Sequence, residues 1–193
     1  MLPWQDISYL KSGTRSQQRA YSCLIDLGIF NDLRDFTPVL VSTVCLDIDT
    51  PSSDLDIICC APDFISFRTR TTQLYGAFDR FQVKESRGGA LVCGFWHLGL
   101  ELELYAHPLP VTEQRAYLHL CQTARVLSHG GPLWRSAIRA LKERGTKTEP
   151  AVAQCLGLRG DPYEEIERLS SLSDEQLAQV VAQRTPALEK ICY

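Results

Sequence analysis

Two aspartates, Asp54 and Asp56, alternate with apolar residues in the segment SDLDII. Side chains alternate between the two faces of a β-strand, so both carboxylates lie on one face, and Leu55 and Ile57 lie on the other. Neighbouring carboxylates on a buried strand repel each other and lose solvation. A hard divalent cation is the commonest partner for such an all-oxygen pair. The pattern therefore predicts a metal-assisted site.

A second acidic face occurs in the segment LELEL, where Glu101 and Glu103 share one side of a predicted strand. If this strand lies beside the strand of the two aspartates, one of the glutamates reaches the side of Asp54 and Asp56. Two or three carboxylates holding two cations are what two-metal phosphoryl or nucleotidyl transfer requires. Strand spacing alone does not choose between Glu101 and Glu103.

The N-terminal half has the elements to position these acids. Its strand patterns lie at 38–41, 55–61, 90–96 and 99–105, the last two forming a hairpin. An apolar helical face at 14–28 ends at Gly28, and the spacing of Leu74, Tyr75, Phe78 and Phe81 favours a helix within 64–84. Exposed edges of the strands in 90–105 would leave room for a homodimer.

From Val111 onward the composition changes to helix formers. Helical patterns run over 111–129 and 133–144, with a break at 130–132, and another helix begins at Thr148. Capping signals at Asp161 and Ser173 open two more short helices. We therefore expect an α+β protein, with an α/β-type domain at 1–110 and a helical domain at 111–193.

Composition limits the classes of function. The 193 residues are 45% apolar and 22% charged with a formal net charge of −3, which argues against general nucleic-acid binding or a membrane-surface protein. No apolar run approaches the roughly 18 residues of a membrane span, and the N-terminus lacks the pattern of a secretory signal. The eight cysteines mostly stand among apolar neighbours without metal-ligand spacing. These features predict a cytoplasmic protein with reduced cysteines.

The arrangement of acids and hydroxyls resembles the signature of polymerase-beta-like nucleotidyltransferases, in which a Gly-Ser or Gly-Gly turn after a strand precedes D-x-[DE] and a later third acid. Here Ser42-Thr43, Asp54-Leu-Asp56 and Glu103 fill those places. More closely, the chain resembles a bacterial family of unknown function in that superfamily, in SDLDI at 53–57, KTEPA at 147–151 and GDPY at 160–163. Ser42 departs from this pattern, because the family has glycine there.

The resemblance implies a nucleotidyltransferase-like mixed sheet flanked by helices, with Mg²⁺ or Mn²⁺ held by Asp54, Asp56 and Glu103. The family motif falls on Glu103 rather than Glu101. The residues expected at the nucleotide are Ser42, Thr43, Ser53 and Lys147. For Arg139 and Lys142, which are weaker candidates for cations at the triphosphate, a solvated helix face is the alternative.

These observations favour a metal-dependent enzyme that transfers a nucleoside monophosphate from a nucleoside triphosphate to a small-molecule or protein acceptor. The alternative is a non-catalytic nucleotide-, metal- or partner-binding module with the same fold. Ser42 motivates this alternative, because a side chain at that position narrows the approach of phosphates to the backbone. A hydrolase that uses the same acids with water as nucleophile also stays open.

Overall fold

A computed structural model describes residues 4–86 and 88–192. The chain divides into two compact units. The sheet unit comprises Met1–Cys45 and Ser52–Tyr117, and the helical unit comprises Leu46–Pro51 and Leu118–Tyr193. The protein is a mixed α+β structure in which a helical half follows a five-stranded sheet.

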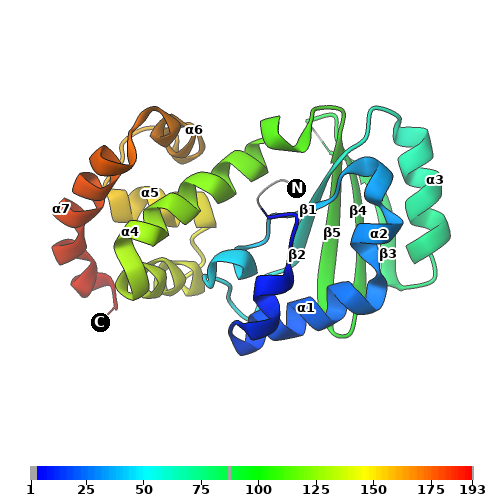
Figure 1. The fold of residues 1–193 in the computed structure, drawn as a ribbon, viewed down its shortest axis with the longest axis horizontal. Helices are drawn as coiled ribbons and strands as arrows, with labels where there is room; N and C mark the ends of the chain where they lie inside the picture. The colour runs from blue at the N-terminus through cyan, green and yellow to red at the C-terminus, as the bar shows by residue number, and fades with distance from the viewer. Residues whose placement is uncertain (1–3, 87, 193) are drawn as a thin grey trace. The chain divides into compact units, whose positions relative to one another are not determined.

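The sheet unit is built on five strands in the order β1-β2-β5-β4-β3 (Figure 1). The strands are β1 (Val39–Leu40), β2 (Leu55–Cys60), β3 (Asp79–Glu85), β4 (Leu91–His97) and β5 (Leu100–His107). β2 and β5 are parallel, whereas the pairs β1–β2, β4–β5 and β3–β4 are antiparallel. The sheet is therefore mixed, with its single parallel pair in the middle.

One face of the sheet is apolar and covered by helices. The helical segments of this unit are η1 (Ser8–Ser12), α1 (Arg15–Leu27), α2 (Ile29–Asp32), η2 (Arg34–Phe36), η3 (Thr43–Leu46), α3 (Phe64–Tyr75) and η4 (Val111–Glu113). Ile57, Leu104 and Phe95 on this face are at most 1% exposed, and the ring of Tyr75 from α3 stacks on Phe95 at 4.7 Å. Burying each such side chain contributes roughly 1.5–3 kcal/mol. This face forms the helix-covered core, whereas the opposite face carries the acids together with the buried side chains of Ile58 and Val92.

The helical unit contains most of α4 and three later helices. Its elements are α4 (Arg115–Glu143), α5 (Thr148–Leu156), α6 (Pro162–Arg168), η5 (Leu169–Ser171) and α7 (Asp174–Cys192). α4 is interrupted at Gly131, whose φ of 64° and ψ of −153° are not helical, just before Pro132. Such a backbone conformation favours glycine, and proline lacks the amide donor of a helix interior.

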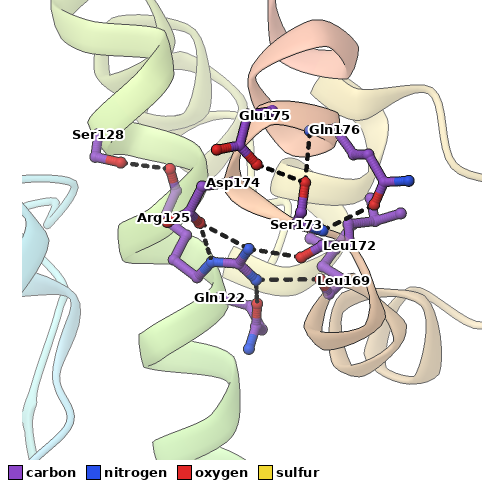
Figure 2. A network of polar contacts seen from close by, with 9 residues as sticks. All are labelled: Gln122, Arg125, Ser128, Leu169, Leu172, Ser173, Asp174, Glu175 and Gln176. Atoms are coloured by element: carbon purple, nitrogen blue, oxygen red, sulfur yellow. Dashed lines mark hydrogen bonds and ion pairs between the residues drawn. The ribbon is translucent and has the colours of Figure 1, made fainter.

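Arg125 of α4 joins three parts of the helical unit (Figure 2). Its guanidinium donates to Asp174 at 2.8 Å and 3.0 Å, to the carbonyls of Leu169 and Leu172 at 3.1 Å and 2.8 Å, and to Gln122 at 2.7 Å. Ser173 caps α7 beside this network, since its hydroxyl accepts from the amide of Gln176 at 3.3 Å. One arginine side chain thus provides hydrogen-bond donors both to backbone carbonyl groups of η5 and its C-terminal end and to the carboxylate at the start of α7.

The connection 46–51 is held by cations of α4. Arg135 donates to the carbonyl of Leu46 at 3.2 Å, and Lys142 donates to that of Ile48 at 2.8 Å. Arg139 pairs with the carboxylate of Asp47 at 2.9 Å. The solvated helix face weighed for Arg139 and Lys142 is therefore wrong, because both side chains fix a loop.

Several expectations from the sequence are confirmed. The helix expected within 14–28 is α1, and Gly28 ends it at a φ of 63°. Asp161 caps α6 by accepting from the amides of Tyr163 and Glu164. The hairpin of β4 and β5 and the break in α4 also lie where predicted. In the described part of the chain, every helix is too short or too polar to cross a membrane.

One expectation is correct only in part, and two are wrong. A helix lies within 64–84, but it ends at Tyr75, and Phe81 lies in β3, an exposed strand that the apolar spacing does not reveal. The helix after Ser173 is not short but runs for 19 residues. The strands in 90–105 are not sheet edges, because both are paired on each side; the edge on that side of the sheet is β3.

Candidate functional site

Asp56 and Glu103 are direct neighbours on the parallel strands β2 and β5. Registered residues on adjacent strands project from the same face, so Glu103 reaches the side of Asp54 and Asp56 as expected. This is the face opposite the helix-covered core, and all three acids are half-buried on it. Glu101 shares the face but is exposed, and it pairs with Trp96 of β4. Both glutamates therefore share the face of the aspartates, and they differ in that Glu103 is half-buried beside Asp56 whereas Glu101 is exposed.

The electrostatic setting of Glu103 is unfavourable for its charge. Burial raises the pKa of this carboxyl group, and the negative charges of Asp54 and Glu101 raise it further, whereas Lys84 partly opposes them. Placing like charges together in a half-buried position costs free energy. Carboxyl groups with pKa values shifted in this way are concentrated at functional sites.

Ser42 and Thr43 lie at the start of the connection that leads to the acids. The Ser42 hydroxyl is fully buried and donates to the carbonyl of Asp54 at 2.6 Å. The Thr43 hydroxyl donates to that of Ser53 at 3.4 Å. These bonds join the end of the first strand region to the residues just before β2, so Ser42 has a structural role that the sequence did not reveal.

The remaining predicted nucleotide-binding residue, Lys147, belongs to the helical unit. It is exposed and occupies the N-cap position of α5, where its side chain makes no capping bond. Another pair of aspartates, Asp47 and Asp49, lies in the connection 46–51 of the same unit. Lys147 remains a prediction for nucleotide binding.

The donor chemistry of the acids suits a hard divalent cation, because all the ligand atoms are carboxylate oxygens. Within residues 4–86 and 88–192, no group of three or more His, Cys, Asp and Glu side chains could hold a metal ion as it stands. Mg²⁺ is usually bound by only one or two carboxylates together with substrate phosphates.

The face of the sheet that carries Asp56 and Glu103, here called the acidic face, extends across β4 and β3. On these two strands it carries residues that the sequence pattern did not mark as candidates. Gly94 of β4 lies beside Glu103, and Gln82 of β3 lies beside Gly94. Next to this row, the guanidinium of Arg80 lies 4.8 Å from the ring centroid of Trp96. Gln82 and Lys84 alternate with apolar residues along β3, and this period-two pattern is the sequence signal that could have placed both side chains on one face of a strand.

A second cluster of titratable groups lies in the helical unit. His119 of α4 places one ring nitrogen 3.3 Å from Glu149 and the other 3.1 Å from Glu167. Burial alone would lower the pKa of His119, but the hydrogen bonds and charges of the two glutamates outweigh it and raise the pKa. The pKa of Glu149 is lowered, because His119 outweighs the opposing effect of burial. This cluster is a compensated ionic network.

The fold and the acids define a mixed α+β protein with three carboxylates on the polar face of its sheet. By its sequence, the chain belongs to the family described as Domain of unknown function (DUF4269), which it matches over residues 22–169. No curated protein matches the chain.

Among solved structures, the chain is similar to one described as the polymerase core of TRAMP, an RNA surveillance complex, with a TM-score of 0.49 and 10% identity. That match covers 92% of this chain and 60% of the other.

Proposed function

We propose that the protein is a metal-dependent nucleotidyltransferase that moves a nucleoside monophosphate from a nucleoside triphosphate to a hydroxyl-bearing acceptor. The observation that carries this proposal is the pairing of Asp56 with Glu103 on adjacent strands, with Asp54 on the same face. Two or three carboxylates in such a cluster are the protein's share of a two-metal site.

The reaction forms a bond between the acceptor oxygen and the α-phosphorus. The bond from that phosphorus to the bridging oxygen of the β-phosphate breaks, pyrophosphate leaves with the electron pair, and the hydroxyl proton passes to solvent. Bound Mg²⁺ or Mn²⁺ would neutralise the phosphates and lower the pKa of the acceptor hydroxyl.

Within this proposal the residues of the chain have separate tasks. Asp54 and Asp56 would hold the cations at the triphosphate, and Glu103 would hold the cation nearer the acceptor. Thr43 and Ser53 are the further groups proposed to contact the nucleotide. The raised pKa of Glu103 supports the assignment, because a cation beside it would remove the unfavourable interaction with Asp54.

Isothermal titration with ATP, GTP, CTP and UTP, each with and without Mg²⁺, tests the proposal. We expect metal-dependent binding of at least one nucleotide, weakened at least 100-fold in Asp54→Asn and Asp56→Asn. Asp35→Asn is the matched control, because Asp35 is 88% exposed in the same unit and its variant loses the same charge. Metal-dependent binding that persists in Asp56→Asn would overturn the assignment.

A non-catalytic nucleotide-binding module is the second candidate, and the buried Ser42 favours it. Its hydroxyl is already used by the carbonyl of Asp54, so it is not directed at a phosphate in this conformation. This alternative predicts nucleotide binding without release of pyrophosphate in a broad acceptor screen. Turnover with any acceptor would exclude it.

A further inference from the structure

One row of paired residues crosses four strands of the acidic face. Asp56 of β2 pairs with Glu103 of β5, Glu103 with Gly94 of β4, and Gly94 with Gln82 of β3. Adjacent strands lie roughly 4.8 Å apart, so Gln82 lies about 10 Å from Glu103 along the row. The row leads from the acids to the sheet edge and passes over a position without a side chain.

The packing of the sheet does not require glycine at position 94. A Cβ atom there would lie 3.6 Å from Nε2 of Gln82 and 3.8 Å from the carbonyl oxygen of Leu102, which are ordinary contact distances. Gly94 also lacks a left-handed backbone conformation, so glycine here weakens the strand without a local benefit. Glycine within a strand often marks a place where a ligand approaches the backbone closely.

Trp96 of β4 and Arg80 of β3 lie next to this row of paired residues, two positions along their strands from Gly94 and Gln82. The β3–β4 pairing is irregular between Asp79 and Gln82, and Arg80 in this irregular segment has a φ of 55°. A left-handed conformation costs an arginine roughly 1–2 kcal/mol. In this backbone conformation, the guanidinium of Arg80 lies over the half-exposed ring of Trp96, and the Arg80 side chain remains 68% exposed.

Charge changes sign across this face. The acids lie on β2 and β5, whereas the exposed cations Arg80 and Lys84 lie on β3, two strands away. Lys84 acts on the charge of Glu103, which it partly offsets. Arg80 also faces the carboxylate of Asp79 at 3.7 Å, so Lys84 is the cation of this edge whose charge acts on Glu103. A molecule that spans the row would therefore meet acids at one end, and Lys84 with the Arg80–Asp79 pair at the other.

We propose that the acceptor of the transfer is a small hydroxyl compound with an anionic group, such as a phosphate, about 10 Å from its reacting hydroxyl. The hydroxyl lies at Glu103, the body of the molecule lies over Gly94 against Trp96, and the anionic group binds Arg80 and Lys84. The assignment as acceptor rests on the proposed nucleotidyl transfer, whereas the anion site itself is a separate property of the sheet face.

Titration calorimetry without nucleotide tests the anion site. The probes are glycerol 3-phosphate, ribose 5-phosphate and O-phosphoserine, each compared with its unphosphorylated form. We expect at least one phosphorylated probe to bind at least tenfold more tightly than its partner. Arg80→Gln and Gly94→Val should weaken that binding at least tenfold, whereas Arg34→Gln, which removes a 72% exposed arginine of the same unit, should not.

The two variants are then titrated with the Mg²⁺ nucleotide, whose affinity should stay within twofold of the wild type. Thermal melting checks that Gly94→Val folds, and Gly94→Ala, which adds only the Cβ atom, replaces it if it does not. Failure of every phosphorylated probe, or unchanged binding in both variants, overturns the proposal. Anion binding in a protein that binds no nucleotide overturns the assignment as acceptor site and, separately, the proposed function.

Discussion

The two units treat buried carboxylates in opposite ways. In the helical unit, Glu149 and Glu167 each face a nitrogen of His119, and the pKa of Glu149 is lowered as a result. In the sheet unit, Glu103 lies beside Asp56 and close to the charge of Asp54, and its pKa is raised. In the helical unit, His119 balances the charge of its glutamate neighbours. In the sheet unit, the charge of Glu103 is only partly balanced, by Lys84.

This difference separates residues that stabilise the fold from residues kept for another purpose. Removing a partner from a compensated network leaves buried groups unsatisfied, which destabilises the protein. Removing one of several carboxylates that repel each other relieves an unfavourable interaction. The sign of the change in unfolding free energy therefore reports to which class a residue belongs.

The largest effect is expected from Arg125→Ala in the helical unit. The variant removes the donor to the carbonyls of Leu169 and Leu172 and to the carboxylate of Asp174. We expect a loss of about 3 kcal/mol in unfolding free energy, because several charge-assisted hydrogen bonds disappear together. Urea denaturation followed by circular dichroism measures it.

Arg168→Ala is the control for Arg125. Arg168 is 65% exposed, and its ion pairs with Glu164 and Glu165 lie within α6. Exposed pairs of this kind contribute at most about 0.5 kcal/mol. Equal losses in the two variants would show that the contacts of Arg125 do not form a stabilising network.

The contribution of the His119 cluster to the free energy of unfolding should depend on pH. The groups that face His119 are Glu149 of α5 and Glu167 and Tyr163 of α6, and Lys142 acts on Glu149. A histidine with a raised pKa stabilises the fold below its unfolded value near 6.5 and loses this effect as the pH rises through the folded pKa. Glu149, with a lowered pKa, stabilises above its unfolded value near 4.5 and loses the effect as the pH falls through the folded pKa.

The cluster therefore stabilises most between about pH 4.5 and 6.5, the ordinary pKa values of its glutamate and histidine. In that window His119→Gln should cost about 2 kcal/mol, with a smaller cost at pH 9. Denaturation of both proteins at several pH values measures the difference. The exposed His129→Gln is the control, and a cost independent of pH would show that His119 is held only by packing.

Local signals carried much of the fold prediction. Asp161 and Ser173 act through bonds to residues two or three positions away, so their helix starts can be recognised without the tertiary structure. The period-two pattern of two strands, together with the assumption that these strands are neighbours, predicted that one of the glutamates lies on the side of Asp54 and Asp56, and the structure pairs Glu103 with Asp56. The family motif added the preference for Glu103.

The features that the sequence did not reveal have a common cause, because they depend on contacts between elements that are distant in the sequence. The spacing of Tyr75, Phe78 and Phe81 fits a helix, but Phe78 lies in a turn and packs against Phe95 of another strand at 5.5 Å. Neither the contact of Arg80 with Trp96 nor that of His119 with its glutamates has a local pattern, since each joins different elements. Such contacts depend on packing rather than on periodicity.

The smallest effect, and the one with the opposite sign, is expected from Glu103→Gln. A carboxyl group with a raised pKa destabilises the fold above that pKa, and the penalty disappears as the pH falls through it toward the ordinary value of 4.5. Because like charges on neighbouring strand positions cost a few tenths to 1 kcal/mol, the variant should gain about 0.5 kcal/mol at pH 8 and nothing below pH 4.

The same Glu103→Gln variant should lose any nucleotidyl transfer that the wild type shows, which would make Glu103 a residue that trades stability for activity. Glu85→Gln is the control, because this exposed glutamate of β3 faces Arg68 at 3.9 Å, and its loss should change stability little. A loss of stability in Glu103→Gln at pH 8 would mean that the fold already compensates this carboxylate. The contrast between the two units would then fail, and so would the electrostatic support for a cation beside Asp54 and Glu103.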